Sequence, residues 1–152
     1  MYCMSFTPAV FYKDPMAALA WLHKAFSFET SMLIEPPVEE PTMMHAEMSL
    51  DGKGRVMVGA EWSAWAKSPA SVAGANTGTI HVDLESSVDE HCERARQAGA
   101  VIEAEPEDQF YGARTYRAKD PEGHVWTFSQ TIRQVSREEA ERASGLKITG
   151  WV

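Results

Sequence analysis

The sequence YGARTYRAKDPEGHVWTFSQ, which runs from residue 111 to residue 130, decides the fold. Its centre, Asp120-Pro121-Glu122-Gly123, predicts a tight turn, because proline fixes the φ of the second position and glycine accepts the positive φ that closes the turn. The flanking residues are rich in β-branched and aromatic side chains, which favours strands over 115–119 and 125–129. The segment is therefore expected to form a β-hairpin.

The second strand of this hairpin alternates in character. Trp126 and Phe128 would point to one face, while Thr127 and Ser129 would point to the other. We expect the apolar face to be covered by a helix and the polar face to stay open to a ligand or to solvent.

The same order of elements occurs twice in the chain, about 70 residues apart, and such internal repeats define a fold early. The first unit reads as strand 6–11, a helix opened by Asp14-Pro15, and strands 28–35, 45–50 and 55–61. The second reads as strand 79–84, a helix opened by the capping box Ser87-Val-Asp-Glu90, strand 101–104 and the hairpin.

These patterns predict an α+β fold in which two βαβββ modules form curved mixed sheets around a concave cavity. We expect one domain over 1–132, with modules at about 5–61 and 79–130 joined by the linker 62–78. A C-terminal helix and tail would occupy 133–152, opened by a second capping box, Ser136-Arg-Glu-Glu139.

The charge and the composition of the chain argue against several classes of function. The 14 basic and 22 acidic residues give a formal charge of −8, which argues against nucleic acid as a partner. The sequence has no apolar run long enough to span a membrane and no secretion signal at its start, so we expect a cytoplasmic protein. The two cysteines, Cys3 and Cys92, have no metal-binding spacing, and Cys92 reads as a small core residue.

The motifs Tyr111-Gly112-Ala-Arg114 and Asp120-Pro-Glu-Gly-His-Val-Trp-Thr-Phe128 resemble those of the vicinal oxygen chelate superfamily. Support comes from Glu93-Arg-Ala-Arg-Gln-Ala-Gly-Ala100 and from Tyr12-Lys-Asp14. This superfamily groups glyoxalase I, the bleomycin-resistance proteins and the extradiol dioxygenases. The resemblance covers about residues 5–132 and is nearest to the bleomycin-resistance-like and uncharacterised glyoxalase-like members.

In the metal-using members of this family, one ligand comes from each of four strands that face the cavity. The resemblance puts these positions at Thr7, Val58, His81 and Thr127, of which only His81 binds a divalent ion well. One imidazole alone does not make a site for zinc, nickel or iron, so no cofactor is expected. If the strand register differs by one residue, Glu47 or Glu61 would join His81 as a fallback metal site.

Three polar side chains are candidates for chemistry at the cavity. His81 is predicted on the concave face of the second unit, and His45 and Glu47 on that of the first. Two imidazoles and a carboxylate could perform general acid/base catalysis. Hydrogen bonding to a neighbouring strand, a polar ligand contact and metal binding are the alternatives for these histidines.

The ligand-binding candidates are mostly aromatic. Trp62 and Trp65 lie in the linker, and Phe110 and Tyr111 lie in a loop at the cavity rim, where a flat organic ligand would stack on them, as the resemblance to antibiotic-binding members implies. Burial under a dimer partner is the alternative. Arg114 would pair with an anionic ligand group or with a carboxylate of the chain.

Two functional hypotheses follow. The first is a metal-free, cytoplasmic homodimer that binds a small molecule, either antibiotic-like or an aromatic metabolite. The second is a metal-dependent enzyme, either a lyase or isomerase like lactoylglutathione lyase or a dioxygenase. It would use zinc, nickel, manganese or iron held by His81 with Glu47 or Glu61, with or without His45.

Overall fold

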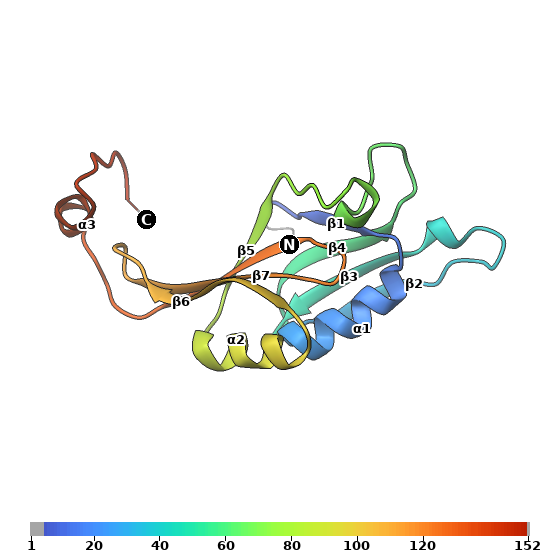
Figure 1. Cartoon of the computed structure of the whole chain (residues 1–152), viewed down its shortest axis with the longest axis horizontal. Coiled ribbons are helices and arrows are strands. Elements are labelled where there is room, and N and C mark those ends of the chain that lie inside the picture. The colour runs from blue at the N-terminus through green and yellow to red at the C-terminus, as the bar shows by residue number, and fades with distance from the viewer. Residues whose placement is uncertain (1–4, 152) are drawn as a thin grey trace.

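The computed structural model describes residues 5–151 and contains the two predicted modules (Figure 1). The first module consists of β1 (Ala9–Tyr12), α1 (Pro15–Phe26), β2 (Glu29–Ile34), β3 (His45–Leu50) and β4 (Lys53–Ala60). The second consists of β5 (Thr79–Asp83), α2 (Val88–Gln97), β6 (Val101–Asp108), β7 (Ala113–Lys119) and β8 (Val125–Thr131). The connections carry the short 3₁₀ helices η1 (Pro41–Met43) and η2 (Pro69–Ser71), and α3 (Arg137–Ser144) follows β8.

Each module forms one mixed, four-stranded sheet. The strand orders are β1-β4-β3-β2 and β5-β8-β7-β6, and in each sheet the first strand pairs in parallel while the others are antiparallel. The predicted fold class is thereby confirmed. Several strand bounds differ from the expected ones, since β1 begins at Ala9, β4 at Lys53 and β7 at Ala113, while β6 continues to Asp108 and β8 to Thr131.

Side chains alternate between the two faces of each sheet as predicted. In β3, Ala46 and Met48 are fully buried toward the helix, whereas His45 and Glu47 lie on the other face and are half-buried. In β8, Trp126 and Phe128 belong to the same buried core. We call the side of each sheet that turns away from its helix the open face.

A single aromatic core joins the two modules. Phe26, at the end of α1, packs against Phe128 with ring centroids 4.7 Å apart, and Phe28 packs against Trp126 at 5.4 Å. Helices α1 and α2 are neighbours on the same side of the molecule (Figure 1). Cys92 on α2 is buried in this core, as predicted, and burial raises the pKa of its thiol to about 11.

The helix ends follow the sequence signals with one exception. The Asp14 carboxylate accepts a hydrogen bond from the Ala17 amide at 3.1 Å and begins α1. For α2 the structure records only half of the predicted capping box, because the Ser87 hydroxyl accepts from the Glu90 amide without a recorded bond in return. The capping box of α3 is complete.

The turn from Asp120 to Gly123 fastens the second module to the first. Asp120 is buried, and its Oδ2 accepts hydrogen bonds from the Tyr12 hydroxyl at 2.6 Å and from Trp126 Nε1 at 3.1 Å. Its Oδ1 accepts from the amides of Glu122 and His124. Burial, together with the Asp120 carboxylate, raises the pKa of Tyr12 well above its usual value.

Two neighbours complete this fastening. The Glu122 carboxylate accepts from the amides of Lys13 at 2.7 Å and Asp14 at 3.1 Å, between β1 and α1. His124, which its place in the turn would put in solvent, is half-buried instead and donates from Nε2 to the Phe11 carbonyl at 2.7 Å. The hairpin therefore positions the end of β1, and with it Phe11.

The C-terminal helix α3 stands apart from both modules at one end of the molecule (Figure 1). Its one buried residue is Ala140, and Trp151 Nε1 donates back to the Val135 carbonyl at 2.9 Å. Among residues 5–151, every helix is too short or too polar to span a lipid bilayer.

Candidate functional site

The strand register aligns the open-face residues of the first sheet in rows. Phe11 of β1, Gly59 of β4 and His45 of β3 lie side by side in one row. The next row holds Met57 and Glu47. A Cβ atom at Gly59 would lie 3.5 Å from the Phe11 ring, so the ring packs over this glycine, in the same row as His45.

An aromatic shelf, formed by Phe11, Trp65 and Trp62, extends from this row. The Phe11 and Trp65 rings meet edge to face with centroids 5.5 Å apart, and Trp65 meets Trp62 in the same way at 5.2 Å. Trp62 is 58% exposed and Trp65 is 68% exposed, so both present apolar surface to solvent. The structure thus brings together two of the predicted ligand-binding aromatics and adds Phe11, which the sequence pattern did not single out.

Glu61 holds the loop that carries the shelf. Its carboxylate accepts from the Ser68 amide at 2.8 Å and from the Ser71 hydroxyl at 3.0 Å, and the Ser68 bond lowers the pKa of Glu61. The Ser68 hydroxyl in turn donates to Glu122 at 2.6 Å. The side chain considered as a fallback metal ligand is therefore engaged in fixing the loop.

Glu47, the other fallback ligand, is also engaged. It lies 3.5 Å from the Arg55 guanidinium, which donates a further hydrogen bond to the Thr7 hydroxyl at 3.1 Å. Glu47 lies on the open face of the first sheet together with His45, whereas His81 lies on the open face of the second sheet.

The open face of the second sheet carries a polar row. His81 of β5, Thr127 of β8 and Arg117 of β7 are aligned across three strands. The Thr127 hydroxyl accepts from Arg117 Nε at 3.2 Å and shares a 2.8 Å hydrogen bond with the Thr79 hydroxyl. His81 itself is exposed.

One of the family metal positions was carried to the wrong face. Val58 is fully buried on the helix side of β4, because the open-face residues of that strand are Met57 and Gly59. His81 and Thr127 do lie on the open face, as expected. Within residues 5–151, no three His, Cys, Asp or Glu side chains come close enough together to hold a metal ion.

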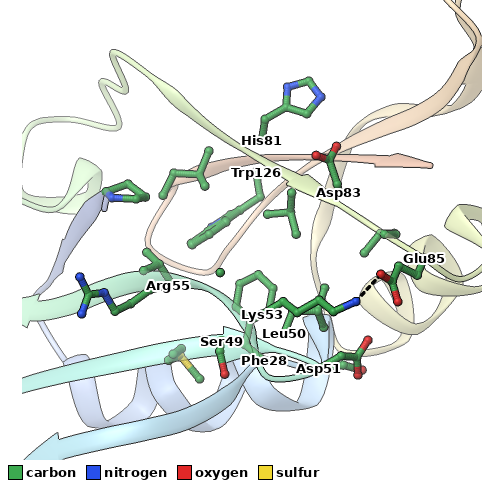
Figure 2. Close-up of a pocket in the computed structure, with 18 of the residues that line it drawn as sticks. Phe28, Ser49, Leu50, Asp51, Lys53, Arg55, His81, Asp83, Glu85 and Trp126 are labelled. Atoms are coloured by element: carbon green, nitrogen blue, oxygen red, sulfur yellow. Dashed lines mark hydrogen bonds and ion pairs between the residues drawn. The ribbon is translucent and has the colours of Figure 1, made fainter. Parts of the chain in front are cut away.

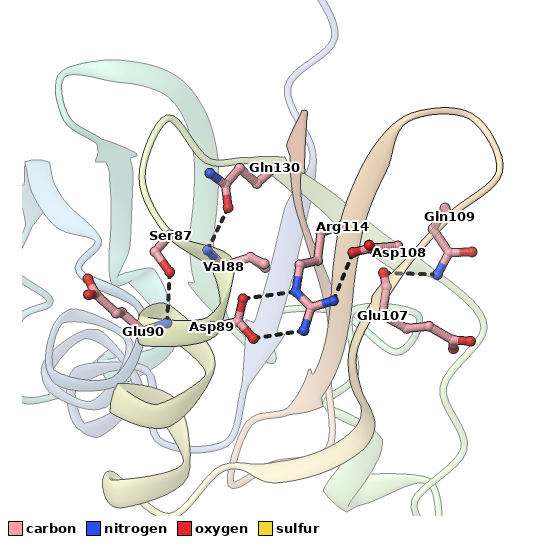
Figure 3. Close-up of polar contacts among 9 residues, drawn as sticks. All are labelled: Ser87, Val88, Asp89, Glu90, Glu107, Asp108, Gln109, Arg114 and Gln130. Carbon is pink, nitrogen blue, oxygen red and sulfur yellow. Dashed lines mark hydrogen bonds and ion pairs between the residues drawn. The ribbon is translucent and has the colours of Figure 1, made fainter. Parts of the chain in front are cut away.

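Arg114 lies on the helix side of the second sheet, away from the open face (Figure 3). Its Nε and Nη2 donate to both oxygens of Asp89 at 2.8 and 2.9 Å, and its Nη1 donates to Asp108 at 2.8 Å. The guanidinium lowers the pKa of the Asp89 carboxyl. Arg114 thus links the first turn of α2 to β6 and β7. It pairs with carboxylates of the chain, which was the alternative to a contact with an anionic ligand.

Phe110 and Tyr111 pack edge to face at 5.2 Å in the connection between β6 and β7. This connection lies at one end of the molecule, and the loop that carries Trp62 and Trp65 lies toward the other end (Figure 1). Within one chain, the four predicted rim aromatics therefore form two separate pairs and not one rim.

One cavity was not anticipated. It has a volume of about 600 Å³, lies between the modules, and is lined by core-facing residues of β3, β4, β5 and β8. Of the predicted site residues, only His81 reaches its rim, and the imidazole points away from the cavity (Figure 2). The alternation in this segment indicated such a wall, since Ile80 and Val82 face inward from β5, which has only one neighbouring strand, and Leu84 continues the pattern.

Comparison with known proteins gives a consistent result. A model of the Glyoxalase/Bleomycin resistance protein/Dioxygenase superfamily matches residues 6–128. The uncharacterized protein Mb0911c of Mycobacterium bovis is 29% identical over 140 residues, which are 90% of each chain. TioX from Micromonospora sp. ML1 is 28% identical with a TM-score of 0.64, over 86% of this chain and 100% of its own. A superfamily member from Sphaerobacter thermophilus shares the fold, with 18% identity and a TM-score of 0.66 over 85% and 98% of the two chains.

Proposed function

The chain belongs to the Glyoxalase/Bleomycin resistance protein/Dioxygenase superfamily, and we propose that it binds a small aromatic molecule on the open face of its first sheet without a metal ion. The observation that carries this proposal is the aromatic shelf, where Trp62 and Trp65 are mostly exposed yet held edge to face with Phe11. Large exposed aromatic surface of this kind favours a ligand or a partner.

The shelf is well prepared for stacking. Its loop is fastened through Ser68 to both Glu61 and Glu122, so little conformational entropy is lost when a ring docks. Aromatic pairs contribute about 0.5–1.5 kcal/mol beyond the area they bury. His45, in the same row as Phe11, offers a polar contact that would orient the ligand.

Binding without a metal is supported by the side chains at the family positions. His81 is the one strong ligand there, and the carboxylates of Glu61 and Glu47 already serve the loop and Arg55. A divalent ion such as zinc needs three or four protein ligands. Recognition would therefore depend on stacking and hydrogen bonds.

We further propose that a second copy of the chain closes the site in a cytoplasmic homodimer. Phe110 and Tyr111 are exposed in the connection between β6 and β7, at the end of the molecule away from the shelf (Figure 1). A symmetric partner would bring such a pair toward the shelf of its neighbour.

Replacing Trp65 with alanine is expected to weaken binding of a flat aromatic probe at least tenfold, because Trp65 contacts both other rings of the shelf. Anthraquinone-2-sulfonate is a suitable probe, and quenching of tryptophan fluorescence in the presence of a chelator gives its dissociation constant. Trp151→Ala is the matched control, because Trp151 is also exposed but belongs to the C-terminal tail. Equal affinity in the two variants, or binding that the chelator abolishes, would refute the proposal.

A further inference from the structure

The cavity between the modules lies on the helix side of the sheets, whereas the aromatic shelf lies on the open face of the first sheet. The modules are fastened at one end by the turn around Asp120, and at the other end the ion pair between Lys53 and Glu85 bridges them. Between these points the edge strand β5 stands away from β3 and β4, which leaves about 600 Å³ of space (Figure 2).

Apolar side chains from both modules face each other across this cavity, and Ser27, Ser49 and Ser86 also line it. One wall comes from Ile80 and Val82 of β5 and from Leu84, which follows this strand, and the opposite wall comes from Met48, Leu50 and Val56. Phe28 and Trp126 form the floor. Ile80, Val82 and Leu50 are only half-buried, so a molecule that covers them gains about 25 cal/mol for each Å² of apolar surface removed from water.

The floor offers no free polar group to a ligand. His91 reaches the cavity, but its Nδ1 accepts from the Tyr116 hydroxyl at 2.6 Å and its Nε2 donates to the Phe26 carbonyl at 2.9 Å. Burial lowers the pKa of His91. Trp126 Nε1 is taken by Asp120. The part of a ligand that rests on this floor must therefore be apolar.

Charge at the mouth discriminates between ligands. The two cations there are already paired, Lys53 with Glu85 and Arg55 with Glu47. Within residues 5–151, Asp51 lines the same mouth without an ion-pair partner. The uncompensated charge at the mouth is negative, so it attracts an ammonium group and repels a carboxylate.

We propose that this cavity is a second binding site, separate from the aromatic shelf, for a small apolar molecule that is uncharged or carries an ammonium group. Its volume lies within the range of about 300–1,000 Å³ that small-molecule sites occupy. The open face and the cavity are on opposite sides of β5, because the His81 imidazole points away from the space that Trp126 borders (Figure 2). The two sites can therefore be filled independently.

The test compares matched naphthalene probes by calorimetric titration of the full chain. The amine 1-naphthylmethylamine is expected to bind saturably, about fivefold more tightly than 1-naphthoate at low salt, and the difference should shrink as salt screens the mouth. Amide chemical shifts in ¹⁵N-labelled protein are expected to change along β5 and at the Trp126 indole. Absence of saturable binding, or tighter binding of the naphthoate, would overturn the proposal.

Two substitutions assign the site. Val82→Trp places a large ring in the cavity from a half-buried edge position and is expected to weaken amine binding at least tenfold. Val101→Trp adds the same bulk at a 58% exposed position on β6 outside the cavity and should leave binding unchanged. Should Val82→Trp fail to fold, the chemical shifts in the unmodified chain decide the question alone.

Binding at the cavity can be distinguished from binding at the aromatic shelf. Trp65→Ala should leave amine binding at the cavity intact while it weakens anthraquinone-2-sulfonate. If instead the amine binds Val82→Trp normally and is lost in Trp65→Ala, its site is the shelf, which overturns the cavity proposal and leaves the proposed function standing.

Discussion

Replacing Asp120 with alanine is expected to lower the free energy of unfolding by about 3–5 kcal/mol, because a buried carboxylate that accepts four hydrogen bonds is removed. The Tyr12 hydroxyl, the Trp126 indole and the amides of Glu122 and His124 would all lose their acceptor. Since these donors come from both modules, the substitution also loosens the contact that positions β1. Urea unfolding at neutral pH measures the change.

Two further variants make this expectation specific. Asp83→Ala removes an exposed aspartate of β5 and should change the stability by no more than about 0.5 kcal/mol. Tyr12→Phe removes one of the four bonds and should cost about 1.5–3 kcal/mol, between the other two. If Asp120→Ala is as stable as Asp83→Ala, the turn does not fasten the modules.

Replacing Gly112 with alanine is expected to destabilise the fold by about 3 kcal/mol or more, because backbone strain and a steric clash add. Gly112 has a φ of +93°, and a Cβ there would lie 2.4 Å from the Arg133 carbonyl oxygen and 2.9 Å from Val135 Cγ2. The segment after β8 cannot retreat easily, since the amides of Ile132 and Arg133 both donate to the Gly112 carbonyl. Thermal and urea unfolding both report the loss.

Gly99→Ala is the matched control for this substitution. Gly99 has nearly the same φ, +95°, but a Cβ there meets no atom within 4 Å. Only the strain of the left-handed conformation is then expected, about 1–2 kcal/mol. Equal losses in the two variants would mean that the C-terminal segment does not pack on Gly112 as described.

The repeat and the alternation of side chains were sufficient to predict the architecture from the sequence. The signals within each module are local, because the turn at Asp120 and the faces of β3, β5 and β8 depend on residues near one another in the chain. The assignment of a family metal position to Val58 was wrong because it depended on the register of a strand. A shift of one residue in a strand moves a side chain to the other face, and periodicity does not fix that register.

The candidate site was less predictable because it depends on contacts between distant segments. Arg114 was a candidate either for an anionic ligand group or for an ion pair within the chain, but its partner Asp89 lies 25 residues earlier on α2, where no local pattern relates the two. The shelf was predicted only in part, since Phe11 joins Trp65 through the folding of the linker onto β1. The cavity between the modules depends on their relative placement, which no pattern within either module encodes.

The proposal that this chain binds its ligand without a metal is tested most directly by elemental analysis of the purified protein. The protein would be incubated with nickel, zinc, manganese or iron(II), desalted, and its metal content measured for each chain. We expect far less than one ion per chain, with unchanged binding of anthraquinone-2-sulfonate. Retention of about one ion per chain, lost in His81→Ala, would contradict the proposal and indicate a metal site built around His81.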